Sequence, residues 1–196
     1  MIDTAIKFLK TQLNNHLWLH EEVAEYFCGP LHAGDGKTPD TPVVSLIAVE
    51  EERTTREQQP QTKTDLTTAL TQSPPVKLNL HVVFAVPVKQ QASDTASLEK
   101  TYLQSLRSIS LVIAFFQSRP RFTAQEHAEL ATAGIDRLCM DLLTLTTEQL
   151  NQLWSYMGTR YMPSAVYRVR MLCLQAQQSS MQQPLVLHPS TNLGGD

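Results

Sequence analysis

The segment KLNLHVVFAVPV, residues 77–88, alternates between apolar and polar side chains in the way that a β-strand does. Every second residue from Leu78 to Val86 is apolar, whereas Asn79 and His81 occupy positions of the other face. One face of this strand is therefore expected to lie on the hydrophobic core.

Three further segments have the composition of strands. The segment VVSLIAVEEE, residues 43–52, is apolar on both faces, which is typical of a strand covered on both sides. The segment AVYRVRMLCL, residues 165–174, places Arg168 and Arg170 on the face opposite its apolar positions. A fourth strand is expected at residues 137–144.

Three helices are predicted around these strands. Residues 2–17 repeat apolar side chains every three or four positions, which is one face of a helix. A second helix is expected at residues 98–118, and the segment from Thr146 to Gln149 has the capping-box pattern of a third helix. The predicted inner stripe of the second helix consists of Tyr102, Leu103, Leu106, Ile109, Val112, Ile113, Phe115 and Phe116.

This order of elements predicts an α+β fold, a single domain over residues 1–174. Its sheet is expected to be mixed or mostly antiparallel, with about four strands and about three helices packed on it. Residues 51–75 are rich in Thr and Gln and close with two prolines, so they are expected to form a long mobile loop. Residues 175–196 are expected to be a flexible C-terminal tail.

The composition restricts the partners. The protein has a net charge of −3 and a pI of about 6.1, so it lacks the positive electrostatic potential that attracts phosphate groups. Nucleic acid is therefore not expected as a partner. The longest mostly apolar stretch, residues 109–116, is far shorter than the roughly 20 residues that cross a bilayer. No signal peptide is recognised at the N-terminus. The three separated cysteines indicate reduced, buried thiols.

The sequence contains fragments of known binding and catalytic motifs, but their residue spacing does not match those motifs. The stretch AGDGKT, residues 33–38, contains the GKT of a phosphate-binding loop, but Leu31 stands where that loop needs glycine. His16 and His20 lie one helical turn apart, yet no third metal ligand is spaced to join them. No catalytic, cofactor-binding or metal-binding residue is therefore assigned, and an enzyme is not expected.

Two groups of charged residues remain as candidate interaction sites. One follows the strand at 43–52, and the other lies on and before the strand at 165–174. A solvated surface is the simpler interpretation of both groups, and docking between copies through opposite charges is the alternative. The candidate interaction residues are Glu50, Glu51, Glu52, Arg53, Arg160, Arg168 and Arg170.

Five segments, in this order, resemble the cap or tail-terminator proteins of extracellular contractile injection systems, the phage-tail-like particles of the antifeeding-prophage and virulence-cassette type. Together these segments span residues 1–174. They are IDTAIKFLKTQLN, VSLIAVEEER, PPVKLNLHVVF, SLVIAFFQSRPRFTA and LWSYMGTRYMPSAVYRVRML.

The resemblance implies a structural role rather than catalysis. Members of the family resemble hexameric rings that end the inner tube and anchor the last sheath ring, distal to the baseplate. The implied partners are further copies of the chain, the tube protein and the sheath protein, with no cofactor and no membrane. Assembly is expected in the bacterial cytoplasm, in a particle that can be released. A noncatalytic assembly adaptor or chaperone-like module is the alternative.

Overall fold

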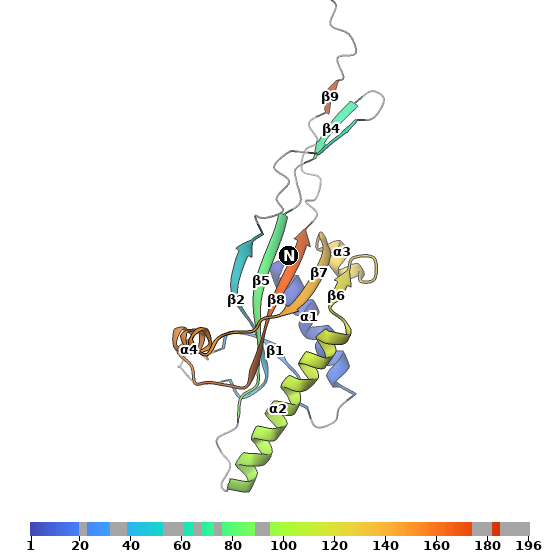
Figure 1. Cartoon of the computed structure of the whole chain (residues 1–196). Coiled ribbons are helices and arrows are strands. Elements are labelled where there is room, and N and C mark those ends of the chain that lie inside the picture. Colours follow the sequence, from blue (N-terminus) through green and yellow to red (C-terminus); the bar gives the residue numbers. More distant parts are fainter. Residues whose placement is uncertain are drawn as a thin grey trace, which may run out of the picture.

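A computed structural model describes residues 1–19, 23–31, 39–52, 61–64, 68–72, 76–88, 95–173 and 182–184. Within these residues a six-stranded sheet has the order β1-β2-β5-β8-β7-β6 (Figure 1). The strands are β1 (Phe27–Cys28), β2 (Val43–Glu51), β5 (Val76–Ala85), β8 (Ser164–Cys173), β7 (Ile135–Leu142) and β6 (Arg121–Thr123).

The four long strands, β2, β5, β8 and β7, pair antiparallel with their neighbours, and among the described strands only β1 pairs in parallel, with β2. The four helices of the described chain are α1 (Ile2–Leu17), α2 (Thr95–Ser118), α3 (Ala128–Thr132) and α4 (Thr147–Tyr156). The predicted α+β class with a mostly antiparallel sheet is confirmed.

The main hydrophobic core lies between one face of the sheet and helices α1, α2 and α3. Phe84 on β5 is at its centre, with ring centroids 5.2 Å from Phe116 of α2 and 5.7 Å from Tyr167 of β8. A second, smaller cluster covers the opposite face, where Trp154 of α4 packs on the sheet with Val83 and Val166. Alternate residues of β5 therefore enter different cores, as the pleat requires.

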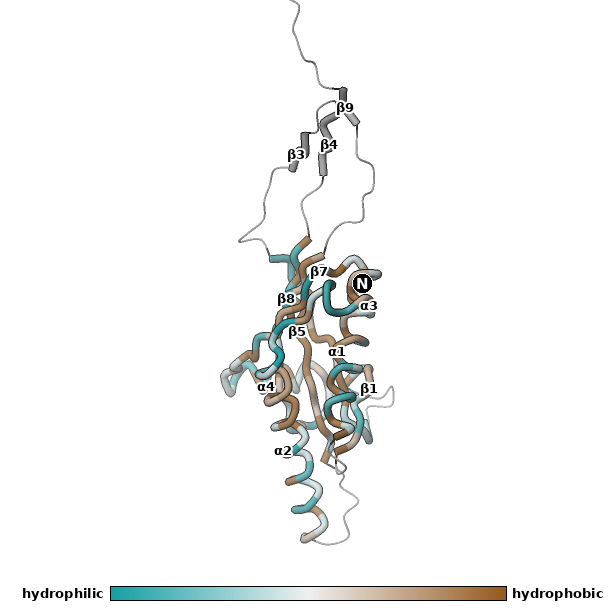
Figure 2. Tube along the Cα trace, turned by 90° about the vertical axis from the view of Figure 1, so that its right-hand side faces the viewer, coloured by the Kyte–Doolittle hydropathy of each residue, from teal (hydrophilic) through white to brown (hydrophobic). Residues whose placement is uncertain are grey.

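The predicted inner stripe of α2 is wrong in its N-terminal part. Tyr102, Leu103 and Leu106 are 46%, 55% and 39% exposed. The buried residues of α2 are Ser105, Ser108, Ile109, Val112, Phe115 and Phe116. The physical reason is the length of the helix, because its N-terminal half projects past the end of the sheet in both views (Figures 1 and 2).

Several short elements were not predicted. At only two to five residues, β1, β6 and α3 are too short to show a period. The segment expected to be a loop contains β3 (Gln61–Thr64) and β4 (Thr68–Gln72), and the expected tail contains β9 (Gln182–Pro184). These three strands form a separate antiparallel sheet in the order β3-β4-β9. The mobility of residues 51–75 stays a prediction.

The cysteines differ in environment. Cys173 is buried, as expected, and its burial raises the pKa of the thiol. Cys28 is exposed, which contradicts the expectation of three buried thiols. It lies in the edge strand β1, whose side chains the core does not cover.

Candidate interaction surface

The face of the sheet that carries α4 is polar at its other end, and we call this region the charged sheet face. Strand register defines it. Glu50 of β2 is opposite Asn79 of β5, which is opposite Arg170 of β8. One row away, His81 of β5 is opposite Arg168 of β8. Residues directly opposite in antiparallel strands share a face, so these side chains lie together.

Asp141 of β7 holds the two arginines of β8 by one carboxylate. Arg170 reaches it with Nε at 2.8 Å from Oδ2 and Nη2 at 3.2 Å from Oδ1. The Nη2–Oδ1 contact is a hydrogen bond, whereas the Nε–Oδ2 contact is a close ion pair without hydrogen-bond geometry, since Oδ2 accepts no hydrogen bond within the described chain. Arg168 Nε is 3.8 Å from the same Oδ2. Two cations share one anion, so this cluster keeps a net positive charge.

The β2 side of the charged sheet face is acidic. His81 Nε2 lies 3.5 Å from Glu50 Oε2, and Asn79 Nδ2 donates a hydrogen bond of 3.0 Å to Glu52 Oε2. Asn79 is only 7% exposed, and its Oδ1 accepts no hydrogen bond within the described chain. A buried acceptor without a donor costs about 1–3 kcal/mol.

The charge therefore changes sign across the strands. Glu50 and Glu52 lie on or just after β2, and Arg168 and Arg170 lie on β8, two strands away. Adjacent strands are about 4.8 Å apart, so the acidic and basic columns are separated by about 10 Å. The row of Arg170 continues through Cys139 of β7 to Arg121 of β6. Such a gradient is complementary to a partner with the opposite gradient.

The residues predicted from sequence divide into three sets. Glu50, Glu52, Arg168 and Arg170 come together on the charged sheet face, rather than at separate sites. Glu51 is exposed but opposite Leu78, which packs against the main core, so it belongs to the other face. The remaining two lie elsewhere: Arg160 is exposed in the segment between α4 and β8, and Arg53 is outside the described residues.

Sequence reasoning missed three members of the charged sheet face, Asn79, His81 and Asp141. The alternation of residues 77–88 already placed Asn79 and His81 on the polar face. The contacts of Asn79 with Glu52, of His81 with Glu50 and of Asp141 with Arg170 could not be found in this way, because each joins distant residues that meet only through strand pairing.

The other motifs contribute no site in the described part of the chain. His16 stacks on Phe115 with ring centroids 4.9 Å apart. Its predicted neighbour His20 and the stretch AGDGKT at 33–38 lie outside the described residues. Among the described residues, no three His, Cys, Asp or Glu side chains gather in a way that could hold a metal. None of the described helices is long and apolar enough to span a membrane.

Comparison with known families and structures gives consistent results. A family model, the Pvc16 N-terminal domain, matches residues 4–188. One similar solved structure is the PVC sheath/tube terminator of an extracellular contractile injection system in the extended state. It has a TM-score of 0.64 and 10% identity, and the match covers 100% of this chain and 64% of that one.

A second similar structure is the tube-terminating cap of the anti-feeding prophage. It has a TM-score of 0.55 and 14% identity, with 92% of this chain and 60% of that chain covered. The chain thus spans less than two thirds of either protein. The comparison with curated proteins found no match.

Proposed function

The chain belongs to the Pvc16 N-terminal domain family, and we propose that it is a structural cap of a contractile injection particle. In this role it ends the inner tube and anchors the last sheath ring at the end distal to the baseplate. The observation that carries the proposal is the family match over residues 4–188, joined to a fold shared with two terminators.

The cap would be a closed ring of copies, with six as the expected number. A ring requires two different surfaces on each copy that fit each other and close after a full turn. The tube below would contact one rim of the ring, and the sheath would contact its outside. Both solved structures are described by a terminating role, which supports a structural function over catalysis.

We assign the charged sheet face to docking within the particle. It combines cations and anions that contacts between neighbouring strands hold in place. Exposed charges of this kind contribute little to folding but select the partner and its register. The gradient therefore favours a partner whose surface is acidic opposite β8 and basic opposite β2.

The test is deletion of the gene in a strain that makes the particle, followed by electron microscopy of particle lengths and ends. Without the cap, tube growth loses its stop and the sheath loses its last anchor. We expect tubes or sheaths of abnormal length, or unstable particles, and restoration by the wild-type gene. Particles of normal length with an intact closed end would overturn the proposal and favour the adaptor role.

A further inference from the structure

The N-terminal half of α2, residues 95–106, projects from the body of the molecule, and we call it the α2 projection (Figures 1 and 2). Ser105, near its inner end, is the one buried residue of the α2 projection, and the other buried residues of α2 are Ser108 or later. Three helical turns alone are marginal in water, so this length of helix is held by its continuity with the packed half.

One side of the α2 projection is apolar, and it extends the buried side of the C-terminal half of the helix. Leu98, Tyr102 and Leu106 follow one another at steps of four residues and are 43%, 46% and 39% exposed. A shallow hollow beside this row is lined by Val88, Thr95, Leu98, Glu99 and Tyr102. Leu103 widens the row and is 55% exposed.

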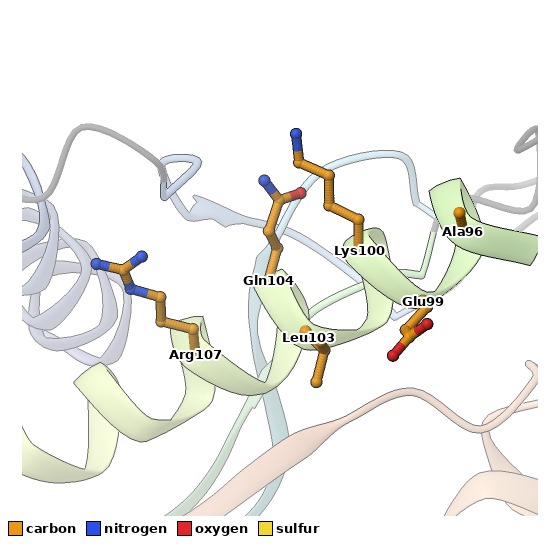
Figure 3. Close-up of a pocket in the computed structure, with 6 residues that line it drawn as sticks. All are labelled: Ala96, Glu99, Lys100, Leu103, Gln104 and Arg107. Atoms are coloured by element: carbon orange, nitrogen blue, oxygen red, sulfur yellow. The ribbon is translucent and has the colours of Figure 1, made fainter.

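Leu103 is flanked by two cations of the same helix. Lys100 precedes it by three residues and Arg107 follows it by four, which are neighbouring positions on a helix surface. Figure 3 shows Lys100, Gln104 and Arg107 pointing to one side of α2 and Glu99 and Leu103 to the other. The α2 projection thus presents an apolar row that is interrupted by Glu99, beside a basic margin formed by Lys100 and by Arg107, which directly follows the projection.

The outer edge of β2 has the complementary composition. Strand β1 pairs only with Val43 and Val44, and no other described strand covers that side of β2. Leu46 is opposite Val82 and Val49 is opposite Leu80, so both point to the helix side of the sheet, where they remain 36% and 45% exposed. Glu51 is opposite Leu78 and shares that side.

The two surfaces cannot meet within one chain. The α2 projection extends beyond the end of the sheet that carries α4, whereas Glu51 lies at the opposite end of β2 (Figure 1). A contact between them needs a second copy. Because the surfaces differ, each contact leaves one of each kind free, so copies continue head to tail until a ring closes.

We propose that the α2 projection of one copy packs on the outer edge of β2 of the next copy. In this contact the apolar row of the projection would cover Leu46 and Val49 of β2. The basic margin would then lie beside Glu51. The apolar side chains of the projection are Leu98, Tyr102, Leu103 and Leu106. The apolar row spans about 12 Å along the helix and residues 46–51 about 17 Å along the strand, so the lengths are compatible. The inference rests on the proposed ring and names the surfaces that join its members.

The test is cross-linking on intact particles. Particles are made in the deletion strain with a chain that carries Cys28→Ser, Val49→Cys and Leu103→Cys, and are treated with a short bismaleimide. A head-to-tail contact links Val49→Cys of one copy to Leu103→Cys of the next. We expect a ladder of dimers, trimers and larger products. Capped particles that yield no ladder would overturn this inference and leave the cap function intact.

Two controls make the result specific. The chain with Cys28→Ser and Leu103→Cys alone should stay monomeric on the gel, and dimers from it would show a two-fold contact between projections, which contradicts the proposal. The chain with Cys28→Ser alone controls for the other cysteines. If the particles end normally with no copy of the chain bound, the cap function itself is wrong.

A charge exchange tests the pairing independently of cysteine. Lys100→Glu and Glu51→Lys should each weaken association of copies by about five-fold, and the two together should restore most of it. The matched control is Lys7→Glu, an exposed charge on α1, which should change nothing. If the double variant instead loses as much association as the two single variants together, Glu51 does not contact the basic margin.

Discussion

At the scale of single residues, burial in α2 depends on position along the helix rather than on hydropathy. Two serines are buried where two leucines and a tyrosine nearby are exposed. The serines are satisfied by hydrogen bonds, since Ser105 Oγ donates to the Thr101 carbonyl at 3.0 Å and Ser108 Oγ lies 3.1 Å from Tyr26 Oη. Burial raises the pKa of Tyr26, which keeps its phenol protonated for this contact.

The first prediction compares two neighbouring residues of α2. Ile109→Ala should lower the free energy of unfolding by about 2–5 kcal/mol, because Ile109 lies in the main core. Leu106→Ala should cost only about 1 kcal/mol, because Leu106 is 39% exposed and does not belong to the main core. Urea denaturation of the free chain measures both. Equal losses in the two variants would contradict the projection of α2.

At the scale of elements, α4 shows how local sequence defines a boundary. The Gln149 amide N–H donates to Thr146 Oγ1 at 3.2 Å, and the Thr146 N–H donates to Gln149 Oε1 at 3.0 Å. This reciprocal pair is the predicted capping box, and it is confirmed. The helix then buries Trp154 in the second core, which secures the α4 end of the sheet.

The second prediction concerns this cap. Thr146→Ala should destabilise the domain by about 0.5–2 kcal/mol, because the first turn of α4 loses the side chain that satisfies its backbone. Thr147→Ala, one residue later and without a capping bond, is the matched control. Thermal unfolding followed by circular dichroism compares them. Identical melting of the two variants would mean that the capping box adds no stability.

At the scale of the whole molecule, the sheet separates two tasks. One face is covered by three helices and supplies the main core, whereas in the described part of the chain the other face is covered beside α4. The open end of that second face carries the charges. If the charged sheet face docks as proposed, stability and recognition use different surfaces, so substitutions on this face should leave the domain folded.

The third prediction uses this separation. Arg168→Gln together with Arg170→Gln should reduce the fraction of capped particles while changing the free energy of unfolding by only about 1 kcal/mol per exposed pair. Salt should act in the same direction, because exposed charges are screened over about 10 Å at 0.1 M. Electron microscopy counts capped ends, and Lys7→Glu is the control. Full capping in the double variant would exclude this face from docking.

The sequence by itself determined the class of the fold and most of its long elements. Periodicity is local, so the alternation at 77–88 and the helical repeat at 2–17 could be read without knowing the neighbours. The same locality allowed the capping box at Thr146 and Gln149 to be predicted. The segments that resemble the cap proteins overlap these elements, and the family model matches residues 4–188, which include them.

Tertiary structure alone decided which strands pair and how far each element extends beyond the core. Asp141 meets Arg170, and His81 meets Glu50, only because strand order and register bring distant segments together. The exposure of Leu106 depends on where the sheet ends, and a helical repeat contains no information about that end. Local patterns record which side of an element is apolar, whereas contacts between elements determine whether that side is covered.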